Sequence, residues 1–110
     1  MRIRKESDDL QEDDILLIAN VSDALAHPAR VKIFRFIMQK NAAQIPVCNK
    51  DVVAEFDYSQ ATISQHIKRL EKSNLVQVRK QDRYSYYTTN VSLLESYFKA
   101  IDKLESGGRT

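Results

Sequence analysis

The chain has 110 residues, of which 43% are hydrophobic and 29% charged, with a formal net charge of +2; these values fit one globular domain and exclude wholesale disorder. No apolar run approaches the ~20 residues that cross a bilayer, and the basic start is followed by acidic residues rather than by the apolar stretch of a secretory signal. One cysteine, Cys48, excludes an internal disulfide and a zinc site built from several cysteines, and the expected compartment is the cytoplasm.

Apolar residues at helical spacing predict two helices in the first part of the chain. Residues 1–9 are expected to form a flexible N-terminal tail, and the first helix runs from about Leu10 to Ala26. The second runs from Pro28 to about Lys40, because the missing N–H of proline would be unpaired at a first helical position anyway. The stretch from Asn41 to Val47 is a predicted loop, since Pro46 disfavours a helix at the residue before it.

Two short helices joined by a tight turn are predicted next. The third helix covers roughly Asn49 to Phe56, with Asn49 as its N-cap. A two-residue turn separates it from the fourth helix, which begins with Ser59, a good N-cap, and ends near Lys72. Asn74 follows, where a left-handed residue is needed and Asn is the usual substitute for glycine.

The last part of the chain predicts a β-hairpin and one more helix. Two β-rich runs, residues 75–80 and 84–89, flank a short polar turn. A final helix is expected from Val91 to about Leu104, with a flexible tail over residues 105–110. The predicted fold is mainly α (α+β), in the order α-α-α-α-β-β-α: a winged helix-turn-helix in which residues 10–104 form one DNA-binding and dimerisation domain.

Positive charge is concentrated in the fourth helix and the hairpin. Residues 58–90 hold six Lys or Arg against two acidic residues. On a helical wheel Ile63, Ile67 and Leu70 form the anchoring face of the fourth helix, and the opposite face carries polar and basic groups that can hydrogen-bond base edges and phosphates. The candidate DNA-binding residues are Ser59, Gln60, Ala61, Thr62, Gln65, Lys68, Arg69, Lys80, Arg83 and Tyr84.

Different members of this set suit different parts of a duplex. Thr62 and Gln65 are the candidates for reading bases. Lys68 and Arg69 point along the backbone and would contribute charge rather than sequence choice. Arg83, at the hairpin turn, is the candidate for reaching a minor groove.

Three stretches resemble arsenic-repressor-type (ArsR-type) regulators. Residues 24–33, with Pro28 and Arg30, resemble the opening of their second helix; residues 59–76 resemble their recognition helix and its exit, and residues 79–87 their wing. The resemblance covers about residues 12–104. It implies a repressor that is released by a signal, and a homodimer in which the first and last helices of two subunits pack together.

Both of those helices carry apolar stripes that exceed what a small domain obviously needs for its own core. An intramolecular core is the alternative explanation of either stripe. The candidate dimer-interface residues are Ile15, Ile18, Leu94, Tyr97, Phe98, Ile101 and Leu104.

The chain departs from the family at its metal sites. Many members sense metals through a Cys-x-Cys pair at the start of the third helix, and others through Asp/His and His/Glu ligands on paired last helices. Here the matching stretch, residues 47–51, supplies one thiol, and the last helix has no histidine. We therefore expect no metal site and no cofactor, and the effector stays unknown. Cys48 is either a thiol sensor or a buried, inert cysteine.

Two other function classes compete with DNA binding. An enzyme is not expected, because the chain has no Gly-rich phosphate loop or nucleophile motif, and its two histidines, His27 and His66, lie on different elements. For His66, packing or hydrogen bonding is favoured over metal ligation. The alternative is a winged-helix protein-interaction module that does not bind DNA. Duplex binding that weakens by orders of magnitude between ~50 and ~200 mM salt would separate the two.

Overall fold

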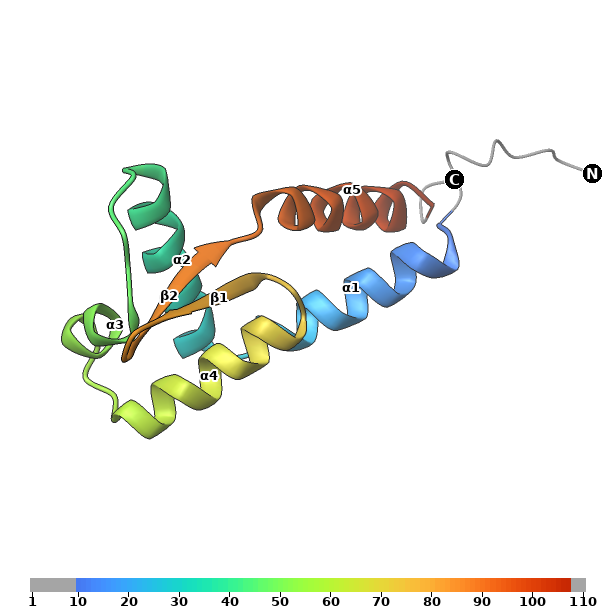
Figure 1. Ribbon diagram of the computed structural model, residues 1–110. Coiled ribbons are helices and arrows are strands. Elements are labelled where there is room, and N and C mark those ends of the chain that lie inside the picture. Colours follow the sequence, from blue (N-terminus) through green and yellow to red (C-terminus); the bar gives the residue numbers. More distant parts are fainter. Residues whose placement is uncertain (1–9, 108–110) are drawn as a thin grey trace, which may run out of the picture.

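The computed structural model describes residues 10–107 and contains the predicted order of elements (Figure 1). The expected tail over residues 1–9 and the last three residues of the expected C-terminal tail lie outside the described part. The helices and strands are α1 (Glu12–Ala24), α2 (Pro28–Ala42), α3 (Asn49–Glu55), α4 (Gln60–Lys72), β1 (Val76–Gln81), β2 (Tyr84–Thr89) and α5 (Val91–Gly107).

Helix α5 is longer than the sequence predicted. The expected end was near Leu104, whereas the helix continues to Gly107. Neither a proline nor another glycine lies between Leu104 and Gly107, so no strong helix breaker stops the helix earlier. Among residues 10–107, no helix combines the length and the apolar character that a bilayer crossing would need.

Local capping explains where α2 and α4 begin. Pro28 occupies the first turn of α2, and the Nδ1 atom of His27 accepts a hydrogen bond from the N–H of Ala29 at 3.1 Å. The Ser59 hydroxyl oxygen accepts from the N–H of Thr62 at 3.1 Å, as expected of this N-cap.

The predicted cap of α3 was wrong. Cys48, not Asn49, occupies the N-cap position, and the Asp51 carboxylate accepts the Cys48 N–H at 2.8 Å. Asn49 is instead the first residue of the helix, and its Oδ1 atom accepts the N–H of Ser85 in β2 at 3.0 Å. The side chain therefore serves a distant strand, a use that local propensity could not reveal.

The hydrophobic core lies where α2, α3 and α4 meet the hairpin. Its largest fully buried side chains come from each of these elements, from the segments that join them, and from the end of α1. They are Val21, Ile33, Ile37, Val47, Val52, Ile63, Leu70, Leu75 and Val76. The burial of Ile63, Ile67 and Leu70 confirms the anchoring face predicted for α4.

The hairpin is a two-stranded antiparallel sheet whose base is fixed to the α2–α3 connection. Val76 pairs with Thr89 at one end and Gln81 with Tyr84 at the other. Asn74 has φ 68° before β1 and adopts the left-handed conformation predicted for it, and Asp82 adopts the same conformation in the turn, with φ 59°. An isolated bridge between Cys48 and Tyr86 adds a short third row of backbone pairing.

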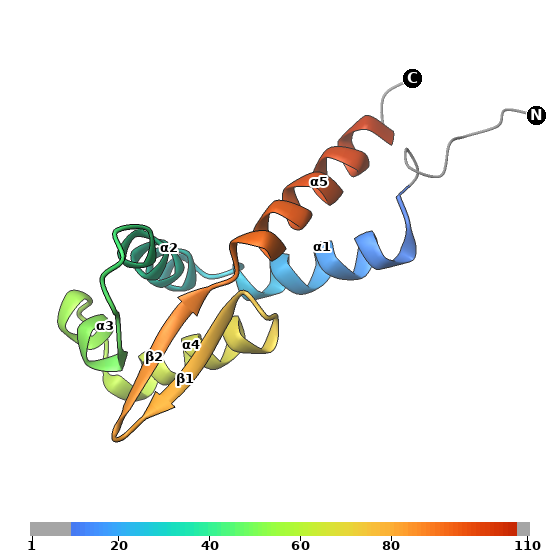
Figure 2. The same ribbon diagram turned by 45° about the horizontal axis from the view of Figure 1, so that its top comes forward.

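Helices α1 and α5 lie side by side (Figure 1), and Figure 2 shows that both project away from the rest of the chain. We call these two helices the arm. Within it the Ser22 and Tyr97 hydroxyls are hydrogen-bonded at 2.9 Å, and the Lys103 ammonium donates to the Asp14 carboxylate at 3.2 Å. The N–H of Gln11 and then Lys103 lower the pKa of Asp14 below its ordinary value. The arm is thus held together by polar contacts at both ends.

Candidate nucleic-acid interface

The outer face of α4 is polar and open to solvent. Ala61, Gln65 and Lys68 are exposed on it, opposite the buried stripe. Of the sequence-predicted DNA-binding residues, Thr62 and Tyr84 are half-buried, and the exposed ones are Ser59, Gln60, Ala61, Gln65, Lys68, Arg69, Lys80 and Arg83. A helix with such a face can present hydrogen-bonding groups to base edges without burying its own core.

In the first turn of α4, Thr62, one of the two residues predicted to read bases, is hydrogen-bonded within the protein. Ser59 caps the helix and also donates its hydroxyl proton to the Thr62 hydroxyl at 3.0 Å. The Thr62 side chain is thereby oriented toward the cap. Gln65, one turn further along, is exposed, and within residues 10–107 its side chain makes no comparable hydrogen bond.

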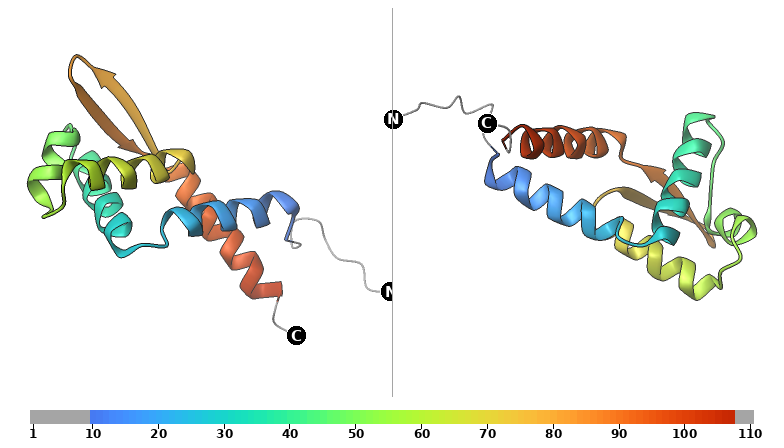
Figure 3. Two further views of the ribbon diagram at one scale, coloured as in Figure 1. Left: turned by 90° about the horizontal axis from the view of Figure 1, so that it is seen from below. Right: turned by 180° about the vertical axis from the view of Figure 1, so that it is seen from behind.

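The wing carries exposed cations at its tip. Arg83 lies in the turn and Lys80 near the end of β1. The Arg79 guanidinium lies 5.5 Å from the ring centre of Tyr86 and donates to the Gln81 side-chain oxygen at 3.1 Å. In Figures 1 and 2 the hairpin tip and the start of α4 lie at the same end of the molecule, and the view from below in Figure 3 separates them. The start of α4 and the hairpin tip therefore offer two separate contact regions at the same end of the folded molecule.

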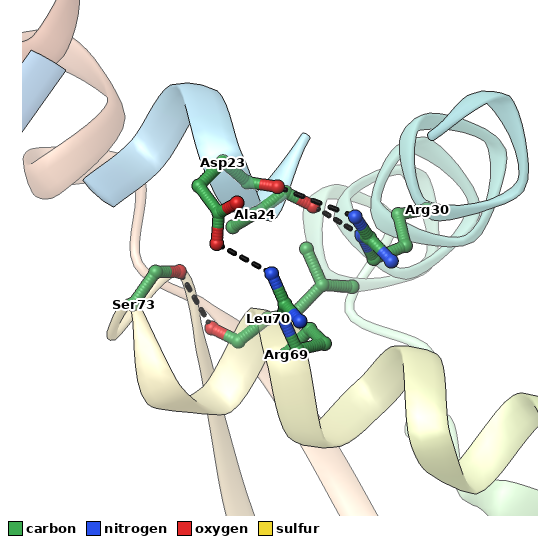
Figure 4. Close-up of polar contacts among 6 residues, drawn as sticks. All are labelled: Asp23, Ala24, Arg30, Arg69, Leu70 and Ser73. Atoms are coloured by element: carbon green, nitrogen blue, oxygen red, sulfur yellow. Dashed lines mark hydrogen bonds and ion pairs between the residues drawn. The ribbon is translucent and has the colours of Figure 1, made fainter. Parts of the chain in front are cut away.

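Arg69 has a partner that the sequence analysis missed. Its guanidinium donates to the carboxylate of Asp23 in α1 at 2.6 Å, which ties α4 to the arm (Figure 4). Both side chains remain substantially exposed, at 49% for Arg69 and 65% for Asp23. One sequence signal existed: an acidic residue in the last turn of a helix is disfavoured by the helix dipole and calls for a cationic neighbour.

Arg30, one of the two residues that carried the resemblance in α2, holds the end of α1. Its Nε donates to the carbonyl oxygen of Ala24 at 2.7 Å, and its terminal nitrogen to that of Asp23 at 3.3 Å (Figure 4). The Asp23 carbonyl also accepts the N–H of Ala26 at 3.3 Å, so Arg30 adds to the backbone hydrogen bonding at this helix end. Pro28 and Arg30 are thus explained by the geometry of the α1–α2 junction.

His66 packs on the flank of α4. Its ring centre lies 4.8 Å from that of His27 and 6.4 Å from that of Tyr58. Burial first, and then the nearby His27 and Arg30, lower the pKa of His66. These surroundings disfavour a charged imidazole and agree with the packing role favoured from the sequence.

The region around Cys48 is closed. The thiol is free, and the residue is only 8% exposed beneath the hairpin. Neighbouring Tyr87 is buried as well, and burial raises the pKa of its hydroxyl to about 12. Across residues 10–107, no three His, Cys, Asp or Glu side chains gather so that they could hold a metal ion.

The arm exposes an apolar surface. Among the predicted dimer residues, Ile15, Phe98 and Leu104 are exposed, by 45%, 58% and 50%. The others, Ile18, Leu94, Tyr97 and Ile101, are half-buried. Leu94 and Tyr97 pack against the core of the same chain, which is the alternative considered for this stripe. Leu16, 52% exposed, also belongs to the apolar surface of the arm, although the sequence analysis did not include it.

Comparisons with known proteins point to regulators of transcription. The sequence profile described as "Bacterial regulatory protein, arsR family" matches residues 27–78. An uncharacterized HTH-type transcriptional regulator of Methanocaldococcus jannaschii is 24% identical over 86 residues, covering 78% of this chain and 92% of that protein.

Solved structures agree on the fold. An ArsR-like transcriptional regulator from Rhodococcus sp. RHA1 superposes with a TM-score of 0.72 at 17% identity, covering 84% of this chain and 83% of that one. A homodimeric winged helix-turn-helix DNA-binding domain from Mycobacterium bovis, a possible ArsR-family regulator, superposes with a TM-score of 0.63 at 18% identity, covering 97% and 91%. The architecture described above is therefore a winged helix-turn-helix.

Proposed function

We propose that the chain, which matches the arsR family of bacterial regulatory proteins over residues 27–78, binds double-stranded DNA as a homodimer and regulates transcription. In this proposal α4 enters the major groove with its outer face, and the wing contacts the backbone or the adjacent minor groove. The role assigned to the protein is recognition, without catalysis.

One observation carries the proposal: α4 turns all of its large apolar side chains inward and leaves a polar face open beside a cationic hairpin. Gln65 can pair with a base edge, and Ala61 is small enough to allow close approach of the helix backbone. Lys68 on the helix and Arg83 on the wing are exposed and suit phosphate contacts. The first turn of α4 adds backbone N–H groups that favour an anion.

The apolar surface of the arm supports the dimer in this proposal. Ile15, Leu16, Phe98 and Leu104 are each 45–58% exposed on two helices that already lie side by side. Exposed aromatic and aliphatic groups gathered on one element are typical of an association surface. A second copy of the chain, packed along the arm, would cover them and place two recognition helices on one duplex.

We further propose that the protein is a repressor whose release does not depend on the family's thiolate metal site. The support lies in the residues at the start of α3, where a single thiol, Cys48, is present and buried. A soft metal ion needs more than one such ligand, and a buried thiol is poorly placed to meet one.

The experiment that tests the DNA-binding part begins with selection of genomic fragments by the purified protein, followed by footprinting. A duplex from this selection is then titrated by fluorescence anisotropy at several salt concentrations. The proposal expects a two-fold symmetric footprint, and an affinity that falls by orders of magnitude between ~50 and ~200 mM salt. If no fragment is enriched, or if binding is insensitive to salt, the proposal is wrong.

A further inference from the structure

The end of α1 carries an acidic side chain at an unfavourable place. Asp23 lies in the last turn of α1, where the helix dipole concentrates negative partial charge. Arg30 is already bound to the carbonyl oxygens of Asp23 and Ala24. The arginine that binds this helix end thus contacts the backbone and not the Asp23 carboxylate. The partner of that carboxylate is Arg69 of α4, 2.6 Å away (Figure 4).

The same arginine is one of the cations on the recognition helix. Arg69 follows Lys68 directly, and it lies at the edge of the polar face rather than on the buried stripe. Its guanidinium can engage either a carboxylate or a phosphate, since both accept two parallel N–H hydrogen bonds. Asp23 and a backbone phosphate are thus alternative partners for one side chain.

The Asp23–Arg69 ion pair is weak enough to be exchanged. With 49% and 65% of the two side chains exposed, solvent screens the attraction. Exposed pairs of this kind change an equilibrium constant by only about 1.5- to fivefold. A duplex, whose closely spaced phosphates surround the recognition helix, offers a stronger field than one carboxylate.

We propose that Asp23 sets the DNA affinity of this protein by competing with a backbone phosphate for Arg69. On binding, Arg69 leaves Asp23 and takes up the phosphate, and the free energy of the lost ion pair is subtracted from that of the complex. The inference rests on the proposed function. It assigns to an acidic residue of the arm, outside the helix-turn-helix, a direct influence on how tightly the recognition helix binds.

The test is a double-mutant cycle on the selected duplex. Asp23→Ala removes the competitor, Arg69→Ala removes the contested side chain, and the double variant removes both; Asp13→Ala, exposed at the other end of α1, matches the change of charge. Fluorescence anisotropy at fixed salt gives each affinity, and thermal unfolding monitors the fold. Asp23→Asn, which preserves size, is measured as well in case the alanine variant unfolds.

The proposal expects Asp23→Ala to bind about 1.5- to fivefold more tightly than wild type, and Asp13→Ala to bind as wild type does. In the Arg69→Ala background, removing Asp23 should bring no gain. The proposal is overturned if Asp23→Ala binds equally or more weakly, which would give Asp23 a purely structural role, or if Asp13→Ala gains as much. Both results presuppose that the wild type binds the duplex, so they are distinct from a failure of the proposed function.

Discussion

The side chain of Asn41, at the end of α2, accepts two hydrogen bonds from Thr89, at the end of β2: one from the backbone N–H at 2.7 Å and one from the hydroxyl at 3.2 Å. The Asn41 amide also donates to the carbonyl oxygen of Tyr87 at 3.3 Å. One side chain thus satisfies several polar groups at the base of the wing, and Thr89 itself is buried. The position of the wing relative to α2 depends on this residue.

Replacing Asn41 by Ala should therefore destabilise the protein. The buried N–H of Thr89 would lose its partner, and an unsatisfied buried donor costs about 1–3 kcal/mol. Urea unfolding monitored by circular dichroism measures the change, with Gln39→Ala, exposed on the same helix, as control. A variant as stable as wild type would mean that the hydrogen bonds of Asn41 make no net contribution to the free energy of unfolding.

The N-cap of α4 gives a second prediction. Ser59→Ala removes the acceptor of the Thr62 N–H and should lower the free energy of unfolding by about 1 kcal/mol. Ser59→Asp restores an acceptor at the same place and should recover most of the loss. Thermal unfolding of the three proteins checks this, and equal losses in both variants would contradict the capping role.

Stability should depend on pH through Asp14. Its pKa is lowered in the folded protein, so the stabilisation it provides is complete above its unfolded pKa and is lost as the pH falls through the folded pKa. The difference in unfolding free energy between wild type and Asp14→Asn should accordingly be constant near neutral pH and shrink below about pH 4. Urea unfolding across this pH range measures the difference in unfolding free energy. A difference that grows toward acid pH would contradict a lowered pKa of Asp14 in the folded protein.

The exposed apolar residues of the arm can be tested by assembly. Phe98→Glu places a charge in the proposed contact between subunits and should convert the proposed dimer to a monomer at micromolar concentration, because burying an unpaired charge is costly. Sedimentation velocity distinguishes the two species. Glu95→Ala, exposed on the same helix, should remain dimeric. A dimeric Phe98→Glu variant would place the interface elsewhere.

The elements and the open face of α4 were predictable because each depends on local signals. Helical periodicity identified the buried Ile63, Ile67 and Leu70, and the need for a left-handed residue identified Asn74. Asn49 and Arg69 were different. Their partners, Ser85 and Asp23, lie 36 and 46 residues away along the chain, and only the folded arrangement brings them together.

The stripe on α5 shows a second limit. Periodicity shows that its apolar residues share one side of the helix, but it cannot divide them between the chain's own core and a partner. In the structure Leu94 and Tyr97 contact the core, while Phe98 and Leu104 face solvent. That division depends on where α1 lies, which the sequence of α5 does not encode.

DNA binding, as proposed, depends on the cationic face formed by α4 and the wing. Its most direct test compares Lys68→Ala/Arg83→Ala with Lys32→Ala/Arg35→Ala, an equal loss of charge from exposed residues of α2. The affinity for a selected duplex is measured from ~50 to ~200 mM salt, where each phosphate contact contributes about 0.9 to the slope of log Kobs against log salt. We predict that the first variant binds more weakly with a slope reduced by roughly 1.8, and that the second keeps the wild-type slope. Equal slopes in all three proteins would contradict the account.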